Sequence, residues 1–304
     1  MYILMDLPET AGTSFRGLLG NVYGPQGVFV GSQYQSLGVA AEAFKSLSAS
    51  EQCQTSLFTS PLEFGLHQRL SGNNRYITLF HNPVDRVAYV YSVMKAERNS
   101  GSLWRRSQSL REFVETASTP EIDNGLVRQV AGNCAGVPIG QVTEAHLELA
   151  KANLREHFEA FGLWEDFTES LVYVGRRLDW DGVPLFRKKA LTSELAATVP
   201  ISSADRAVIE KRCRLDIELY NYARQLYKAE IADLGSGFAD EVRAYDGALR
   251  DLDRIICVER EDWKKKNSKF WQMTRKPAAA IGRVRKMLGI RTRLQAVARV
   301  FTQH

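Results

Sequence analysis

The stretch YILMDLPETAGTSFRGLL, residues 2–19, points most directly to the fold of this chain. It opens with a short apolar run from Tyr2 to Leu7, which is typical of a strand buried inside a sheet. Pro8 and a Gly-Thr-Ser turn come next, and an amphipathic pattern from Ser14 to Leu19 then predicts the start of a helix. A strand, a tight turn and a helix N-terminus in this order present backbone N–H groups that favour an anion. The residues alone are equally compatible with a simple tight turn.

Further short apolar runs bounded by turn residues predict the rest of a sheet. The predicted strands are Tyr2–Leu7, Gly27–Gly31, Ser56–Thr59, Tyr76–Phe80 and Leu171–Val174. The predicted helices are Ser14–Leu19, Pro83–Arg98, Leu110–Ala117, Asp123–Ala131, Thr143–Phe158 and Ser202–Ala232. Strands that alternate with helices predict an α/β fold, in which helices cover both faces of a parallel sheet. We expect the broad aromatic face of the last helix to pack onto that sheet.

Charge is distributed unevenly along the 304 residues. The net charge is +5, yet twelve of the 40 Lys and Arg residues, and no Asp or Glu, lie between Lys264 and His304. A break at Gly235-Ser236-Gly237 divides the chain into a predicted catalytic-type domain over residues 1–234 and a helical, basic C-terminal extension over 235–304. We call residues 264–304 the basic block. It could bind an anionic membrane surface, an acidic glycan or a partner protein, and the alternative is a solvated helix that packs back on the acidic body. No nucleic-acid recognition motif accompanies it, so we do not expect nucleic acid as a partner.

Composition excludes several classes of protein. The chain is 44% hydrophobic and 25% charged, as globular proteins are. No apolar run approaches the roughly 18 to 20 residues that span a bilayer, and no secretory signal precedes the first strand. The expected location is therefore cytoplasmic, with peripheral contact to the inner membrane surface through the basic block as one option, and the alternative is a domain cut from a longer precursor. The five histidines show no metal-ligand spacing, so we expect no metal site.

Four later stretches share their order and spacing with a known family. RYITLFHNPVDRVAYVYS (75–92) is a strand that ends in an Asn-Pro-Val-Asp-Arg turn and opens a helix. It is followed by DNGLVRQVAGN (123–133), LELAKANLREHFEAFGLWEDFTESLVYVGRRLDW (147–180) and RLDIELYNYARQLY (214–227). With the loop after the first strand, the set resembles the carbohydrate sulfotransferases that include the heparan sulfate 2-O-sulfotransferases and many bacterial relatives. The resemblance covers about residues 1–230.

This resemblance implies a P-loop-like, three-layer fold that uses 3′-phosphoadenosine 5′-phosphosulfate (PAPS). The first loop would hold the 5′-phosphosulfate, and the turn after the strand at 76–80 would hold the 3′-phosphate. A carbohydrate hydroxyl would be the acceptor and a general base would take its proton, so catalysis would rest on positioning and charge stabilisation. The implied cofactor-binding residues are Pro8, Thr10, Gly12, Thr13, Ser14, His81, Arg86 and Tyr89.

Three of the implied positions depart from the family pattern. Glu9 stands where the family has a catalytic Lys, and His81 and Tyr89 replace an Arg and a Ser of the 3′-phosphate turn. Two unit charges about 4 Å apart interact by about 4 kcal/mol at an effective dielectric near 20, so exchanging Lys for Glu changes the site by up to roughly 8 kcal/mol. Protonation of Glu9, or its pairing with Arg16, would relieve the repulsion without restoring the missing donor.

Other residues are candidates for the remaining roles. His67 is a candidate general base, with a hydrogen-bonded structural His as the alternative. Arg128 is predicted to bind the nucleotide or an anionic acceptor, with a surface salt bridge as the alternative. Lys188 and Lys189 are candidate substrate-binding residues because they follow the strand predicted at 171–174. Two functions follow: PAPS-dependent sulfo transfer to a carbohydrate hydroxyl, or an altered or inactive sulfotransferase fold that binds a glycan or partner protein.

Overall fold

The computed structural model describes residues 1–7, 12–60, 63–96, 109–116, 119–186, 200–252 and 254, without the side chains of residues 12–14, 93, 94 and 96. The strands are β1 (Tyr2–Met5), β2 (Val28–Val30), β3 (Leu57–Ser60), β4 (Arg75–Phe80) and β5 (Phe158–Leu163). The α-helices are α1 (Gly12–Tyr23), α2 (Leu37–Lys45), α3 (Ala49–Gln54), α4 (Pro83–Ala96), α5 (Leu110–Thr116), α6 (Gly125–Ala131), α7 (Glu144–His157), α8 (Phe167–Arg177), α9 (Ser203–Arg212) and α10 (Arg214–Asp233). Short 3₁₀ turns include η2 (Leu66–Arg69) and η4 (Pro120–Ile122), and a further helix occupies residues 236–252.

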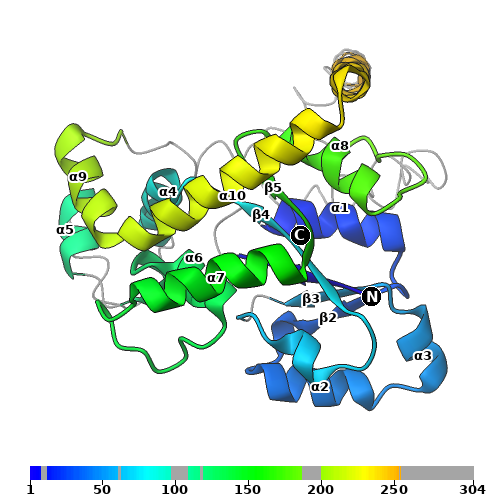
Figure 1. Ribbon diagram of the computed structural model, residues 1–304, viewed down its shortest axis with the longest axis horizontal. Coiled ribbons are helices and arrows are strands. Elements are labelled where there is room, and N and C mark those ends of the chain that lie inside the picture. The colour runs from blue at the N-terminus through cyan, green and yellow to red at the C-terminus, as the bar shows by residue number, and fades with distance from the viewer. Residues whose placement is uncertain are drawn as a thin grey trace, which may run out of the picture. The chain divides into compact units, whose positions relative to one another are not determined.

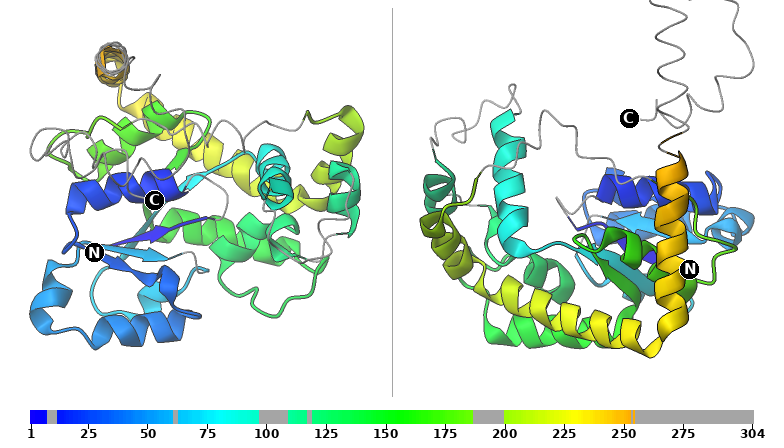
Figure 2. Two further views of the ribbon diagram at one scale, coloured as in Figure 1. Left: turned by 180° about the vertical axis from the view of Figure 1, so that it is seen from behind. Right: turned by 90° about the horizontal axis from the view of Figure 1, so that it is seen from above.

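The described strands form one parallel sheet with the order β2-β3-β1-β4-β5. In Figure 1, α1 and α8 lie on one face of this sheet, and α2, α6 and α7 lie on the other. Helix α10 runs alongside α6 and α7 and reaches β5 (Figure 2). The predicted α/β fold, a parallel sheet between two layers of helices, is confirmed.

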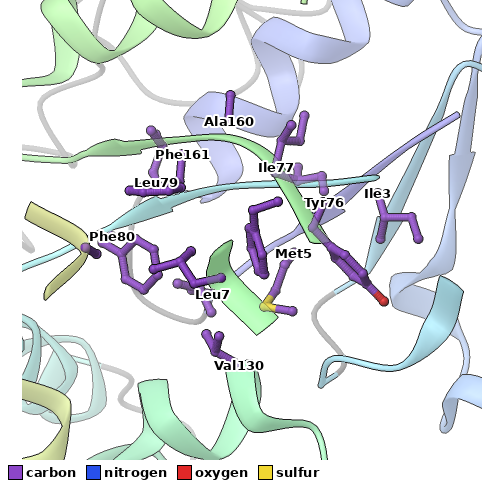
Figure 3. Packing of buried hydrophobic residues seen from close by; sticks show 14 of the residues in the cluster. Ile3, Met5, Leu7, Tyr76, Ile77, Leu79, Phe80, Val130, Ala160 and Phe161 are labelled. Atoms are coloured by element: carbon purple, nitrogen blue, oxygen red, sulfur yellow. The ribbon is translucent and has the colours of Figure 1, made fainter. Parts of the chain in front are cut away.

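The central strands are buried on both faces, which explains their continuous apolar sequences. Along β4, Ile77 and Leu79 point to one face, whereas Tyr76 and Phe80 point to the other (Figure 3). Val130 of α6 points toward the side chains at the end of β1. The core therefore extends through the sheet from one helical layer to the other, and it holds the strand ends in fixed positions.

The strand predicted over Leu171–Val174 is wrong, because these residues lie inside α8. The fifth strand is β5, whose first residue, Phe158, was expected to end the preceding helix. All four residues of the 171–174 run are buried, since α8 packs against β5 and also contacts α10 through Tyr173 and Ser170. Four consecutive helical residues that are all buried form a short apolar run, and such a run cannot be told from a buried strand by its pattern alone.

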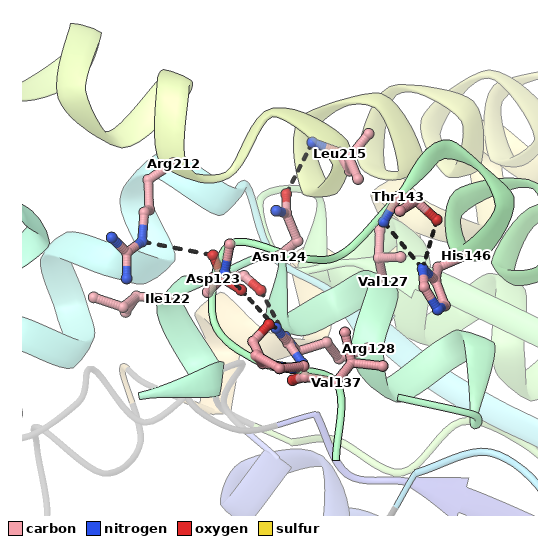
Figure 4. A network of polar contacts seen from close by, with 12 residues as sticks. Ile122, Asp123, Asn124, Val127, Arg128, Val137, Thr143, His146, Arg212 and Leu215 are labelled. Atoms are coloured by element: carbon pink, nitrogen blue, oxygen red, sulfur yellow. Dashed lines mark hydrogen bonds and ion pairs between the residues drawn. The ribbon is translucent and has the colours of Figure 1, made fainter. Parts of the chain in front are cut away.

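The long helix predicted over Ser202–Ala232 is also wrong in its continuity, because α9 and α10 meet at Cys213. The backbone N–H groups of Leu215 and Asp216 donate to the Asn124 Oδ1 atom, at 2.9 and 3.2 Å (Figure 4). This cap for α10 comes from the start of α6, so no local pattern signals the break. The aromatic face was expected to pack onto the sheet. Its Tyr220 and Tyr227 are buried, and their hydroxyls bond Glu165, just beyond β5, and Glu169 of α8.

The chain divides into two compact units, one over residues 1–249 and another over 250–304. The first domain was expected to end at residue 234, but Phe238 and Tyr245 belong to the core of the first unit. Within the second unit, the structure describes residues 250–252 and 254, so the basic block at 264–304 lies outside the described residues. In the described part of the chain, no helix is both long and apolar enough to cross a bilayer.

Candidate functional site

Strands β1, β4 and β5 end side by side at the carboxyl edge of the sheet. Phe80 is paired with Leu163, and the Thr78 hydroxyl donates to the Met5 carbonyl at 2.7 Å. The chain crosses from β3, on one side of β1, to β4 on the other, so β1 lies where the strand order changes direction. Ligands of open α/β sheets bind in the crevice at this place. The connection after β1 and the turn after β4 therefore form the candidate site.

The connection between β1 and α1 is described only in part. Pro8, Glu9 and Thr10 lie outside the described residues, while the backbone of Gly12, Thr13 and Ser14 forms the first turn of α1. The connection begins at Asp6, whose half-buried carboxylate lies 3.2 Å from the Arg16 guanidinium. Burial raises the pKa of Asp6, and Arg16 lowers it by a smaller amount. Arg16, considered above as a partner for Glu9, thus has Asp6 as a described partner.

The turn between β4 and α4 holds a carboxylate that comes from the end of β5. The Glu165 Oε1 atom accepts the backbone N–H of Asn82 at 2.7 Å, and its Oε2 atom accepts the Tyr220 hydroxyl at 2.9 Å. The His81 Nε2 atom lies 3.7 Å from Glu165 Oε1. The Asn82 Oδ1 atom in turn accepts the backbone N–H of Val84 at 2.9 Å, which caps α4. The carboxylate of Glu165 therefore lies in the turn just before the N-terminus of α4.

Arg86 points into the protein interior, and its side chain is only 1% exposed. Its Nη2 atom lies 3.6 Å from Asp216 Oδ2 and donates to the Glu121 carbonyl. Asp216 is completely buried and accepts the backbone N–H of Val127 at 2.9 Å. Burial raises the pKa of Asp216 to about 6, although Arg86 lowers it. The guanidinium predicted to hold a phosphate is thus committed to an internal carboxylate, and Tyr89, on the same helix, is half-buried.

Arg128 is also held inside the protein (Figure 4). It donates to the carbonyl of Asp123 at 2.9 Å and to its carboxylate at 2.6 Å. It also donates to the carbonyls of Val137 and Pro138, at 2.8 and 2.9 Å. Arg128 is only 6% exposed, so the predicted alternative of a salt bridge on the surface is wrong. Its contacts instead fasten the segment that follows α6. Arg212 approaches the second oxygen of Asp123 at 3.7 Å.

His67 lies near the opposite edge of the sheet. Its Nδ1 atom is 3.1 Å from the Tyr76 hydroxyl, which also accepts the backbone N–H groups of Gly65 and His67. Burial, and then the neighbouring His157, lower the pKa of His67. Tyr76 is near the start of β4 and about 13 Å from its carboxyl end at the usual rise of a strand. The geometry therefore fits His67 as a hydrogen-bonded structural residue and not as the general base.

At the carboxyl edge, Asp6 follows β1, and Glu165 after β5 contacts His81 and Asn82 after β4. Glu165 was not among the predicted site residues. It was missed because the fifth strand was predicted at 171–174; with the strand at β5, Glu165 is two residues beyond a strand end. Lys188 and Lys189 lie outside the described residues. They were chosen because they follow a strand predicted at 171–174, and that reason no longer holds because the segment is helical. Among the described side chains, no three His, Cys, Asp or Glu residues are grouped to hold a metal ion.

The residues of the β4–α4 turn do not fit the 3′-phosphate of PAPS. The Asn82 N–H that would face such a phosphate donates to Glu165, and Arg86 is paired with Asp216. A phosphate brought to this turn would meet the Glu165 carboxylate and no described Arg or Lys of the turn. No family model and no curated protein sequence matches the chain, so a function has to rest on the geometry of this edge.

Proposed function

We propose that this protein is sulfotransferase-like and binds a nucleotide with its 5′-phosphate or 5′-phosphosulfate at the carboxyl edge of the sheet, in order to transfer a sulfo group to a carbohydrate hydroxyl. One observation carries the proposal: the β1–α1 connection and the β4–α4 turn are neighbours at the point where the strand order changes direction. These are the two places to which the resemblance assigns the nucleotide.

The start of α1 supports an anion at this place. Helix α1 begins at Gly12, shortly after the end of the central strand, and has no acidic residue in its first turn. Its first backbone N–H groups have no partner within the helix, and the helix dipole adds partial positive charge there. A 5′-phosphate or phosphosulfate is an anion of the size that such a helix start accepts.

The second candidate is the same fold without sulfo transfer, used to bind a glycan or a partner protein. It is favoured by the carboxylate of Glu165 in the β4–α4 turn and by the commitment of Arg86 to Asp216. Glu9 at the family Lys position points the same way. The basic block at 264–304 would then supply the binding surface for an acidic glycan or an anionic membrane, which stays a prediction.

The two candidates differ in nucleotide binding, which a thermal shift measures. We expect adenosine 5′-phosphate or 3′-phosphoadenosine 5′-phosphate, or both, to stabilise the protein. A ligand at about 100 times its Kd adds about 2.7 kcal/mol to the free energy of unfolding, which is a few degrees in Tm for a domain of this size. Glu9→Lys is expected to enlarge the shift, because it exchanges a repelling charge for an attracting one.

The control is Glu42→Lys on α2, which makes the same change of charge on an exposed helix and should leave the shift unchanged. A nucleotide that binds is then tested with its 5′-phosphosulfate form and a panel of glycan acceptors, in which labelled product identifies transfer. If neither nucleotide shifts Tm for wild type or Glu9→Lys, nucleotide binding is excluded and the second candidate stands.

A further inference from the structure

Glu165 is held in the β4–α4 turn by two hydrogen bonds from different elements. Asn82, in the turn itself, donates its backbone N–H to Oε1 at 2.7 Å, and Tyr220, from α10, donates its hydroxyl to Oε2 at 2.9 Å. The backbone adds a third constraint, because the Trp164 N–H donates to the Phe80 carbonyl at 2.7 Å. The carboxylate is therefore a fixed part of this turn and not a mobile surface charge.

The carboxylate remains accessible from outside. A third of the Glu165 side chain, 33%, is exposed, whereas the side chains of Arg86 and Asp216 are 1% and 0% exposed. The basic side chain that Glu165 meets in the turn is His81, at 3.7 Å. A ligand that enters the turn thus meets a hydrogen-bond acceptor with negative charge, while the guanidinium of α4 faces the interior.

Such an acceptor distinguishes two kinds of ribose. A free hydroxyl donates a hydrogen bond to a carboxylate, whereas a phosphate on the same oxygen brings negative charge and only acceptor atoms. Dinucleotide-binding folds use this difference, since an acidic residue there selects a free ribose hydroxyl and an Arg accommodates a ribose phosphate. In this protein the acidic residue is present in the turn, and the Arg is turned away.

We infer that the β4–α4 turn accepts a nucleotide with a free 3′-hydroxyl and rejects one with a 3′-phosphate, and that Glu165 makes this selection. The inference rests on the proposed nucleotide site and changes its ligand class from 3′-phosphorylated to 3′-hydroxyl adenine nucleotides. Tyr220 acts as a positioning residue, because its hydroxyl holds the second oxygen of the Glu165 carboxylate.

The test compares two ligands that differ only at this position, adenosine 5′-phosphate and 3′-phosphoadenosine 5′-phosphate, by isothermal titration calorimetry on the full chain. Wild type is expected to bind the 3′-hydroxyl nucleotide at least about tenfold more tightly. Glu165→Gln keeps the size of the side chain and one acceptor oxygen but removes the charge. We expect it to lower this preference about tenfold or more, chiefly through tighter binding of the 3′-phosphate.

The matched control is Glu169→Gln. Glu169, on α8, likewise accepts a hydrogen bond from a tyrosine of α10, Tyr227, at 3.0 Å, but it is outside the turn. This variant should keep the wild-type preference. Tyr220→Phe should reduce the preference by a smaller factor than Glu165→Gln, with both nucleotides still bound.

The outcomes separate the inference from the proposed function. A wild type that binds the 3′-phosphate more tightly, or a preference that Glu165→Gln leaves unchanged, overturns the inference while the nucleotide site stands. Binding of neither nucleotide overturns both. If Glu165→Gln fails to fold, as judged by its melting curve, Glu165→Asp is measured instead; by shortening the side chain it should weaken the preference without abolishing it.

Discussion

Arg86 and Asp216 form an ion pair that is removed from solvent, with side chains that are 1% and 0% exposed. Burial penalises both charges, and at 3.6 Å their attraction offsets only part of that cost. This is why the pKa of Asp216 is raised to about 6 from an ordinary value of 3.8 even with Arg86 beside it. The pair joins α4 to α10, so its chemistry is structural.

The raised pKa of Asp216 predicts a dependence of stability on pH. Because the pKa of Asp216 is higher in the folded than in the unfolded protein, Asp216 contributes fully to the free energy of unfolding below about pH 4. This contribution is lost as the pH rises through about 6. Asp216→Asn is neutral throughout and keeps an acceptor oxygen for the Val127 N–H. We expect the free energy of unfolding of wild type, minus that of Asp216→Asn, to fall by up to about 3 kcal/mol across this range. Urea denaturation at several pH values measures it, and a difference that rises with pH contradicts the assignment.

At the scale of elements, α8 packs unusually close to β5. A Cβ atom at Gly162 of β5 would lie 2.4 Å from the Cβ atom of Ser170 and 2.8 Å from a methyl group of Leu79. The Ser170 hydroxyl bonds both the N–H and the carbonyl of Leu163, at 2.8 and 3.0 Å. Since α8 follows β5 directly, this contact sets the course of the chain around Glu165 and thus the position of its carboxylate.

Gly162→Ala is expected to destabilise the protein by about 1–3 kcal/mol, because the backbones of β5 and α8 have to move apart to admit the methyl group. The control is Gly17→Ala in α1, where an added Cβ has no atom within 4 Å. That change should stabilise the protein by about 0.5–1 kcal/mol, as it does at exposed helix positions. Chemical denaturation of both variants measures the contrast, and a neutral Gly162→Ala would show that α8 is less closely held.

At the scale of the whole first unit, α10 is fastened to α8 and the end of β5 by tyrosine–carboxylate hydrogen bonds. Tyr220 donates to Glu165, and Tyr227 donates to Glu169 while its oxygen lies 3.2 Å from the Ser170 hydroxyl oxygen. A third pair joins Tyr173 of α8 to Glu230 of α10. Burial, with a contribution from the neighbouring carboxylates, raises the pKa of all three tyrosines well above 10. The helix that carries Tyr220 is thus one part of a larger polar interface.

These tyrosines predict the behaviour of the protein in alkali. Because the pKa values of these tyrosines are raised in the folded protein, they contribute fully to the free energy of unfolding below about pH 10. This contribution is lost as the pH rises further. We expect the free energy of unfolding of wild type to fall more steeply between about pH 9 and about pH 11 than that of Tyr227→Phe, which should cost about 1 kcal/mol at neutral pH. Tyrosinate absorbance should show these groups ionising only as the protein unfolds. Parallel pH profiles for the two proteins would refute the expectation.

Local sequence patterns were sufficient for the class of the fold and most of its elements. Apolar runs bounded by turn residues identified β1, β3 and β4, because a strand buried on both faces has no polar side. The same kind of run identified β2, although its residues are partly exposed. Helical periodicity identified α7 for the complementary reason, since it has one buried face. The connection after β1 and the turn after β4 were placed correctly at strand ends, which follows from those assignments.

Which charges face the candidate site depends on contacts between distant parts of the chain. Arg86 and Arg128 were predicted to bind a ligand, but both are held inside the protein by carboxylates. Arg86 pairs with Asp216, which is distant in sequence, and Arg128 pairs with the buried Asp123. Glu165 was overlooked because four consecutive buried residues of α8 resemble a strand, while β5 follows α7 without a turn. Side-chain direction depends on partners that the fold brings together from far along the chain, and local patterns carry no information about them.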